Sequence, residues 1–376
     1  MNPSPDNSAA PPSGSPTLTF RGGGWVIALA GLLVAMLLGW SLLGPMLGRR
    51  PVGDGRTLES YGFDLSTLLV PREALVPSGN PRGFLPSLDR PQHLRSAEMK
   101  VFNENNRPKY VVSLDRVAGT VINGQAHAWP LSMMNVHEVV NDTVAGVPVA
   151  ATYSPLCDSV VVFDRRVGGS ERLFEVSGLL VDSNLVFYDK APVGTDPAAH
   201  AASLFVQLER RAVAGPLAAA GTVLEPLPGV CITTWQDWLA RHPDTTVTLR
   251  DASTVRRIKE ISYARYFLSP KLEFPATPEP NAAEMESLGL RLKSPMLAVL
   301  SRSGWTTIPI ERYQKGGSRE AQIAVDGVSM TLYLPEGPAA ARVERADGAP
   351  LVSLPLLYFA SEALLRPRET VRTLAD

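Results

Sequence analysis

Between Trp25 and Leu43 the chain runs for 19 residues without a charged side chain. As a helix, at about 1.5 Å per residue, this run is about 28 Å long, close to the thickness of the hydrocarbon core of a bilayer. A second tryptophan, Trp40, stands near its far end, where an indole prefers the membrane interface. The sequence therefore predicts one transmembrane helix over residues 25–47, with the lipid bilayer as its partner. A cleaved signal peptide is the alternative, but the polar lead is long and no small-residue cleavage site precedes Arg49.

The residues on either side of this run bear on the orientation of the chain. Residues 1–24 are rich in Pro, Ser and Asn, so we expect a disordered polar tail. Arg21 precedes the apolar run, whereas Arg49, Arg50 and Arg56 follow it. By the positive-inside rule this local count places the part after the helix in the cytoplasm, but the excess is small and large domains cross largely regardless of charge. The residues alone leave the side of the membrane open.

The composition excludes one class of partner and favours one kind of fold. The 376 residues include 36 basic and 37 acidic ones, for a net charge of −1. Since neutralising phosphates requires clustered Lys and Arg, and no basic stripe is present, a nucleic-acid partner is excluded. Hydrophobic residues make up 45% of the chain, enough to bury a core, and 30 Gly and 33 Pro favour short strands and turns. Two cysteines, Cys157 and Cys231, allow at most one disulfide.

An Asn-Gly pair predicts a hairpin early in the first folded unit. Asn123-Gly124 separates two alternating runs, and this pair favours the positive φ angles that a type I′ turn requires. In this hairpin His127 alternates with alanines, so we expect it to face the solvent. Four later apolar segments predict further strands: Val147–Tyr153, Val160–Asp164, Leu173–Val176 and Leu185–Tyr188.

Two short helices are expected in the same unit. One begins near Ser132 and carries Val140 on its apolar face at helical spacing. The other begins after Thr234, which with Asp237 three residues on predicts a capping interaction. Its tryptophan Trp238 is expected in the core.

The second half of the chain weakly repeats these signals. Three pairs of segments resemble each other in the same order: 119–131 and 297–310, 145–155 and 326–335, and 235–247 and 356–371. In the last pair we expect a helix over Leu356–Leu365 to match the one that begins after Thr234. We therefore predict an α+β fold, β-rich with short helices, made of two related units of which the second is eroded. One β-rich domain with recurrent turns is the alternative. The expected parts are the tail 1–24, the transmembrane helix 25–47, a Pro-rich lead-in along the surface 48–109, the first unit 110–250, a connector 251–292 and the second unit 293–376.

Residues 121–165 carry a specific resemblance. They read VINGQAHAWPLSMMNVHEVVNDTVAGVPVAATYSPLCDSVVVFDR, which resembles the signature of the bacterial domain-of-unknown-function family 3179. That signature is a hairpin, then A-Y-P-L, H-E-I-V-N-D, G-x-P-V, T-Y-C-P-L-C-G-S and F-D-R. The likeness extends to residues 61–79 upstream and 233–245 downstream. The family has no established activity, and its members usually look exported, which implies an extracytoplasmic domain held at the bacterial inner membrane.

The chain departs from the family signature at its first cysteine. Cys-Pro-Leu-Cys becomes Ser154-Pro-Leu-Cys157, and the following Gly becomes Asp158. A C-x-x-C pair can close a redox disulfide or give two thiolates to a metal, and serine does neither. We therefore expect any chemistry that needs both sulfurs to be lost or altered.

A second motif resembles a zinc site only superficially. His137-Glu138-x-x-Asn141 has an amide where H-E-x-x-H has its second imidazole, so a metalloprotease is excluded. Two interpretations of His137 and Asn141 stay open. They either bond backbone groups at the edge of a packed helix or belong to a binding site.

Cys157 is the remaining thiol of the signature. With His137 it could form a thiolate nucleophile or half of a site for a transition metal, the one cofactor that these residues suggest. Against this, Asp158 would raise the pKa of the thiol, and a free cysteine is often an inert core residue. The candidate binding residues are His137, Glu138, Asn141, Ser154, Cys157 and Asp158.

These observations favour one function and leave another open. The first hypothesis is a membrane-anchored binding or scaffold protein of the bacterial envelope with a degenerate ligand site. The alternative is a metal- or thiol-dependent enzyme that uses Cys157 and His137. A further possibility is that the second unit docks an unidentified protein partner.

Overall fold

The computed structural model describes residues 24–46, 51–192, 200–250, 262–314, 317–334, 337–365 and 372–373. The chain divides into two compact units, residues 1–51 and 52–376. The predicted tail up to residue 23, the start of the connector at 251–261 and the predicted segment 366–371 lie outside the described residues.

The first unit contains one long helix. α1 spans Gly24–Met46, and large apolar side chains along it, such as Met36 and Leu37, are exposed. The structure describes the side chains of this helix as far as residue 39. Within the described part of the chain, no helix has the combined length and hydropathy needed to cross a membrane.

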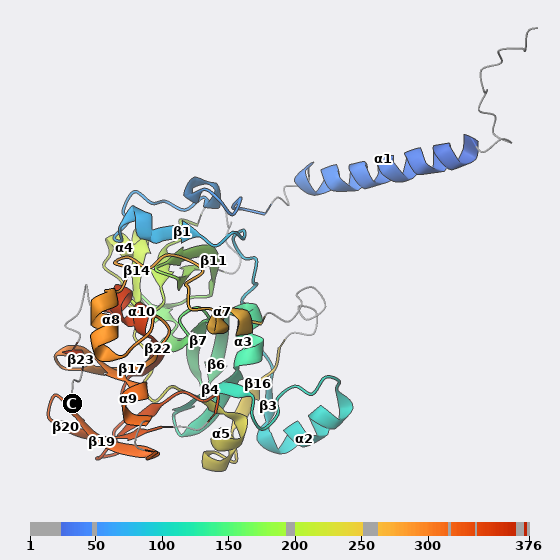
Figure 1. Cartoon of the computed structure of the whole chain (residues 1–376). Helices are drawn as coiled ribbons and strands as arrows, with labels where there is room; N and C mark the ends of the chain where they lie inside the picture. The colour runs from blue at the N-terminus through green and yellow to red at the C-terminus, as the bar shows by residue number, and fades with distance from the viewer. Residues whose placement is uncertain are drawn as a thin grey trace, which may run out of the picture. The chain divides into compact units, whose positions relative to one another are not determined.

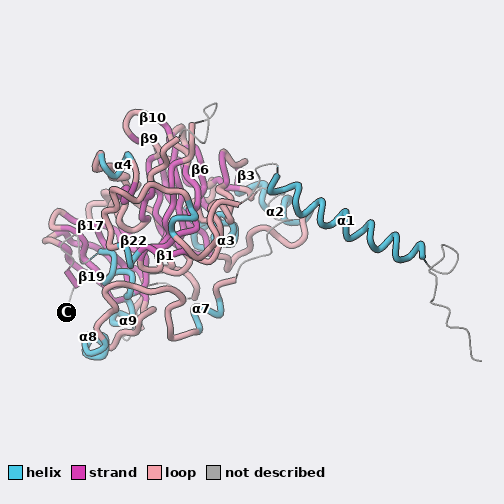
Figure 2. The backbone as a smooth tube through the Cα atoms, turned by 90° about the horizontal axis from the view of Figure 1, so that it is seen from above, coloured by secondary structure: helices cyan, strands magenta, loops and turns pink. Residues whose placement is uncertain are grey.

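The second unit is β-rich, with short helices around its strands (Figure 2). Three strands of the signature, β6, β7 and β8, form one sheet with β2, here called the signature sheet. Its order is β2-β6-β7-β8, with bounds Leu88–Asp89, Val139–Val144, Val147–Ser154 and Ser159–Asp164. Positive φ angles at Ala145 and Gly146 form the tight turn between β6 and β7. Thus the predicted strands at 147–153 and 160–164 are confirmed.

A second sheet is built on the predicted hairpin. Its order is β15-β4-β5-β16-β3, with bounds Cys231–Thr234, Arg116–Ile122, Gln125–Pro130, Thr246–Thr248 and His93–Arg95. Asn123 and Gly124 have φ angles of 48° and 78°, so the type I′ expectation is met. β16 lies between β5, to which it is parallel, and β3, to which it is antiparallel.

A third sheet carries the two remaining predicted strands. Its order is β1-β11-β12-β13-β14, with bounds Leu75–Pro77, Phe174–Val181, Asn184–Asp189, Leu204–Val206 and Arg211–Ala214. Three aromatic rings, Phe174, Phe187 and Phe205, pack together between its strands and the signature sheet. A two-stranded ribbon adjoins it, formed by β9 (Arg166–Val167) and β10 (Ser170–Glu171).

The second half forms two further sheets, which lie together at one side of this unit in Figure 1. One has the order β22-β17-β18-β23, with bounds Ser353–Leu357, Pro295–Ser301, Gly304–Pro309 and Arg372–Thr373. The other has the order β19-β20-β21, with bounds Glu320–Val325, Val328–Tyr333 and Arg342–Arg345. In the first of these, β17 is antiparallel to β18 and β22, and β23 is parallel to β18. The same directions relate β4, β5, β15 and β16.

The helices among the described residues of the second unit are short. They are α2 (Ser96–Asn105), α3 (Leu131–His137), α4 (Pro216–Ala219), α5 (Trp235–Arg241), α7 (Ala264–Leu268), α8 (Ala282–Leu288), α9 (Ile310–Gln314) and α10 (Tyr358–Ala360), with the one-turn elements η2 (Leu58–Tyr61), η3 (Arg72–Ala74) and η5 (Ser361–Leu365). Thr234 caps α5 by accepting a hydrogen bond from the amide of Asp237 at 3.2 Å, as predicted.

Two expected helices differ from the structure. The helix near Ser132 ends at His137, because Glu138 takes up a left-handed conformation and the β-branched residues from Val139 onward pair with β7. Val140 and Asn141 therefore lie on strand β6. The helix expected over 356–365 begins at Tyr358, because the residues before it complete β22.

The lead-in is not a surface segment. Tyr61 and Leu75 are buried in the main core, and β1, β2 and β3 each join a different sheet of the first half. These strands are two or three residues long and are held by backbone pairing, so they leave no periodic signal in the sequence. The same core includes Trp305 and Phe359 of the second half.

Candidate functional site

The turn between β7 and β8 presents three of the candidate residues. Ser154 pairs with Ser159 across the strands, and the amide of Cys157 donates to the carbonyl of Ser154 at 3.2 Å. This tight turn directs the side chains of Ser154 and Cys157 inward, and both are buried. The third residue, Asp158, has a positive φ angle and remains partly accessible.

Cys157 lies in an environment that disfavours the thiolate. Its sulfur is 3.5 Å from the carbonyl oxygen of Ser183 and 3.5 Å from the side-chain amide of Asn184. Burial raises the pKa of this thiol to about 12, despite hydrogen bonds from Ser154 and Asn184 that act in the opposite direction. The thiol is therefore protonated at neutral pH and is a poor nucleophile. Cys157 and Cys231 are both free thiols.

Asp158 is engaged in holding the turn. Both of its carboxylate oxygens accept hydrogen bonds from the guanidinium of Arg116, at 2.9 and 2.8 Å. The hydroxyl of Tyr153 donates to the same carboxylate at 3.0 Å. These bonds tie the β7–β8 turn to the first strand of the predicted hairpin.

His137 and Asn141 contact backbone groups. The Nδ1 atom of His137 lies 2.7 Å from the carbonyl oxygen of Pro86. The side chain of Asn141 donates to the carbonyl of Phe174 at 2.8 Å and accepts from its amide at 2.9 Å. Asn141 thereby ties β6 to the start of β11. Cys157 instead contacts Ser183 and Asn184, so these two candidate residues share no hydrogen-bond partner among the described residues.

Glu138 projects into a cavity next to these residues. It caps α3 in a left-handed conformation, and its amide donates to the carbonyl of Met134 at 2.7 Å. The hydroxyl of Tyr263 donates to its carboxyl at 3.4 Å. Removal from solvent raises the pKa of Glu138 to about 8, so the carboxyl is mostly neutral at pH 7.

The cavity has a volume of about 220 Å³. Of the six candidate binding residues, Glu138 and Ser154 line it. Glu273 is the second acidic lining residue, and Phe84, Tyr263 and Phe274 supply aromatic surface. None of the lining residues that the structure describes is a Lys, Arg or His. The cavity thus combines apolar walls with carboxyl and hydroxyl groups.

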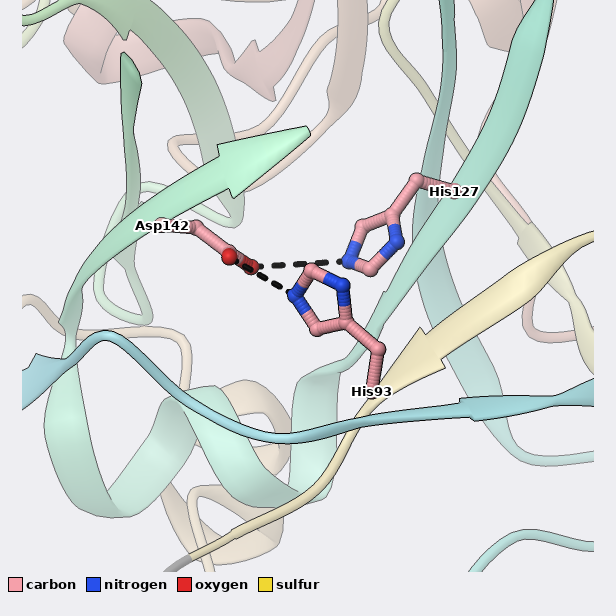
Figure 3. Close-up of side chains that lie close together, drawn as sticks. All are labelled: His93, His127 and Asp142. Atoms are coloured by element: carbon pink, nitrogen blue, oxygen red, sulfur yellow. Dashed lines mark hydrogen bonds and ion pairs between the residues drawn. The ribbon is translucent and has the colours of Figure 1, made fainter. Parts of the chain in front are cut away.

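A second group of polar side chains was missed by the sequence analysis. His93 on β3 and His127 on β5 both direct an imidazole nitrogen toward Asp142 on β6 (Figure 3). The Nε2 atom of His93 lies 2.7 Å from Oδ1 of Asp142, and that of His127 lies 3.5 Å from Oδ2. Among the described residues, these three form a group whose potential metal-ligand atoms all lie within 4.8 Å of one another.

The expectation that His127 faces solvent is wrong. Its side chain is fully buried, because Asp142 of the signature sheet faces it and the neighbouring strand β16 places Thr246 and Thr248 beside its two ring nitrogens, each at 2.7 Å. Alternation with small alanines could not reveal that a second sheet packs against this side chain. Burial lowers the pKa of His127, although Asp142 opposes this effect.

Asp142 is also buried and receives several hydrogen bonds. The indole of Trp129 donates to Oδ2 at 3.0 Å, and the hydroxyl of Thr248 donates to the same oxygen at 2.9 Å. Burial alone would raise the pKa of Asp142, but the hydrogen bonds and charges of His127 and His93 hold it well below the usual range. Asp142 directly follows the candidate residue Asn141, and this was the one feature of the sequence that could have pointed to Asp142 as a site residue. His93 lies 49 residues earlier and gave none.

Comparison with known proteins identifies one family. A family model described as a protein of unknown function (DUF3179) matches residues 82–333. The matched range contains Glu138, Ser154 and all three residues of the His93–His127–Asp142 group. No curated protein and no solved structure matches the chain.

Proposed function

The chain belongs to the DUF3179 family of proteins of unknown function, and from that premise we propose that it is a binding protein for a small organic amine. The ligand occupies the cavity lined by Glu138 and Ser154, with its ammonium group at Glu138. The observation that carries this proposal is that the ionisable side chains lining the cavity can give it a negative charge but not a positive one. Glu138 and Glu273 are acidic, and no basic side chain stands among the described lining residues.

The electrostatics of Glu138 favour a cation. Its raised pKa means that an ionised carboxylate is poorly stabilised in the empty cavity. An ammonium group beside it supplies the missing opposite charge, whereas a carboxylate ligand would add repulsion. The hydroxyl of Ser154 can accept a further hydrogen bond from the ammonium group.

The walls set the size and character of the rest of the ligand. A cavity of about 220 Å³ is smaller than the roughly 300–1,000 Å³ typical of sites for drug-sized molecules, so a compact ligand is expected. Phe84, Tyr263 and Phe274 offer aromatic surface to an apolar body and aromatic faces to a cation.

Binding without turnover fits these residues better than catalysis. Serine at position 154 gives the cavity a hydroxyl that stays protonated, and Cys157 behind it is buried with its pKa raised to about 12. The alternative, an enzyme that uses Cys157 and His137, needs Cys157 as a thiolate nucleophile, and the burial of this thiol disfavours that form.

Calorimetric titration of the full chain in detergent tests the proposal. The probe is phenethylamine, and 3-phenylpropionate serves as a ligand of similar shape with the opposite charge. We expect saturable binding of the amine only, weakened about 10-fold or more by Glu138→Gln because the charge pair is lost. Glu104→Gln, at an exposed position on α2, should leave the affinity unchanged. The assignment would be refuted if the parent bound phenethylamine and 3-phenylpropionate equally well. It would also be refuted if Glu138→Gln bound the amine as tightly as Glu104→Gln does.

We further infer that the protein is anchored in the bacterial inner membrane by residues 25–47, with residues 52–376 outside the cytoplasm. The support is the uncharged apolar run and the exported character of the resembled family. In cells, we expect the chain to resist extraction by alkaline carbonate and to be digested by protease added to spheroplasts. Release by carbonate would contradict the anchor, and full protection from protease would contradict the orientation.

We also infer that the two halves arose by duplication. The support is the shared strand order, in which β15-β4-β5-β16 and β22-β17-β18-β23 have the same pairing directions. In both halves a short helix, α3 or α9, follows the second strand of the central hairpin directly.

A further inference from the structure

The sheet that contains the predicted hairpin brings two histidines to one place. β16 runs between β5 and β3, with Thr246 opposite His127 and Thr248 opposite His93. Because the two imidazoles flank a single strand, their rings approach to 4.5 Å between centroids. Asp142 enters from the neighbouring signature sheet and faces both rings (Figure 3).

We propose that His93, His127 and Asp142 bind one divalent transition-metal ion of the zinc class. Two imidazole nitrogens and one carboxylate oxygen form a ligand set that suits such ions, and three protein ligands leave a position for water or another ligand. This site is separate from the Glu138 cavity, since none of its three residues lines that cavity.

The distances between ligand atoms are close to those that zinc requires. With metal–ligand bonds of about 2.0–2.1 Å in a tetrahedral site, ligand atoms lie roughly 3.3 Å apart. The separation of 3.5 Å between Nε2 of His127 and Oδ2 of Asp142 already matches this value. Nε2 of His93 lies 2.7 Å from the other carboxylate oxygen, Oδ1, and one ligand atom from each of the three residues lies within 4.8 Å of the others, so a shift of the His93 side chain closes the site on an ion.

His93 is the residue that can make this adjustment. Its side chain is 27% exposed, whereas those of His127 and Asp142 are 0% and 2% exposed. It therefore also marks the route by which an ion and water can enter. The two buried ligands provide a fixed pair, and the accessible one completes the site.

The surroundings orient the buried ligands in the way that metal sites require. The Nδ1 atom of His127 lies 2.7 Å from the hydroxyl of Thr246, which leaves Nε2 directed at Asp142. The indole of Trp129 donates to Asp142 Oδ2 at 3.0 Å and holds the carboxylate. The hydroxyl of Thr248, now 2.7 Å from Nε2 of His127, keeps its own bond to Asp142 when an ion takes its place at that nitrogen.

Metal titration of the full chain tests this proposal. The protein is stripped with EDTA, dialysed and titrated with Zn²⁺ alone against a chromogenic chelator. We expect the parent protein to bind one Zn²⁺ ion per chain. The affinity of His93→Ala should be lower by about 10-fold or more, because the loss of a residue that only orients a metal ligand already lowers metal affinity about 10–100-fold. The control is His200→Ala, because His200 also pairs with a buried aspartate, Asp189, at 3.3 Å but lies outside the proposed site. That variant should bind Zn²⁺ like the parent.

Thermal unfolding gives a readout that is independent of the chelator. Bound Zn²⁺ should raise the melting temperature of the parent and of His200→Ala, but not that of His93→Ala. Since His93 is accessible, its replacement should leave the fold intact, which circular dichroism verifies. Stoichiometric binding that is unchanged in His93→Ala, or no binding above the chelator background, would overturn the proposal. Neither result affects phenethylamine binding, so this proposal and the proposed function fail separately.

Discussion

His127 and Asp142 lie on strands of two different sheets, and the Nε2 atom of His127 approaches Oδ2 of Asp142 to 3.5 Å in a fully buried setting. The hydroxyl of Thr248 lies within 2.9 Å of both atoms. The imidazole therefore reaches the signature sheet in two ways: directly across 3.5 Å, and through the hydroxyl of Thr248, which donates to Asp142.

We expect His127→Leu to destabilise the protein by about 1–3 kcal/mol, even without metal. The change removes two hydrogen bonds to the hydroxyls of Thr246 and Thr248 and the imidazole beside the buried carboxylate of Asp142, and the loss of two such bonds carries a cost of this size. Urea unfolding in the presence of EDTA measures the effect. His200→Leu, at a partly exposed site, should cost less. Equal stability of the parent and His127→Leu would show that this connection contributes nothing.

Gly119→Ala should destabilise the protein by about 1–3 kcal/mol through overpacking. A Cβ atom at this position would lie 2.5 Å from the indole ring of Trp238, which is itself buried. In a Trp238→Leu background the added methyl group meets a smaller side chain. The cost of Gly119→Ala should therefore shrink there, and additivity of the two changes would argue against a direct clash.

Glu138→Gln should stabilise the protein increasingly as the pH rises from 5 to 8. Burial raises the pKa of Glu138 to about 8, so the folded protein keeps a proton that the unfolded chain has lost above about pH 4.5. The parent therefore loses stability through this window, while the glutamine variant does not. Denaturant unfolding at several pH values measures the difference. Glu104→Gln is the control, and a constant difference for Glu138→Gln across the window would contradict the raised pKa.

Cys157 should react slowly with thiol reagents in the folded protein. Its sulfur is buried and its pKa is raised to about 12, whereas Cys231 is half-buried on β15. In a Cys231→Ser variant, we expect labelling of the native state to be slower than in urea by on the order of 100-fold or more. Rapid labelling of the folded Cys231→Ser protein would revive the thiol-enzyme alternative.

Local signals in the sequence predicted those parts of the fold that depend on a few neighbouring residues. Asn123-Gly124 specified a turn because positive φ angles are needed at both positions. Thr234 specified a helix start because its hydroxyl reaches the amide of Asp237. The strands at 147–153 and 185–188 were evident from their apolar runs.

Features that depend on distant strands could not be predicted in this way. His93, His127 and Asp142 meet only because β3, β5 and β6 from two sheets converge, and a side chain's neighbours on other strands are not encoded nearby. Similarly, the helical spacing after Ser132 was overridden at Glu138, where pairing of β6 with β7 outweighed the local pattern. The candidate residues Glu138 and Ser154 were found, but their shared cavity was not.

The proton balance of amine binding tests the central claim most directly. At pH 7 Glu138, with a pKa of about 8, is mostly protonated, and pairing with an ammonium ion must expel that proton. Titration of phenethylamine in two buffers of different ionisation enthalpy should therefore report release of most of one proton per bound ligand by the parent protein. Glu138→Gln should show weaker binding with no proton release. Binding of the amine by the parent without any proton release, at an affinity that Glu138→Gln retains, would contradict the assignment of Glu138 as the ligand's partner.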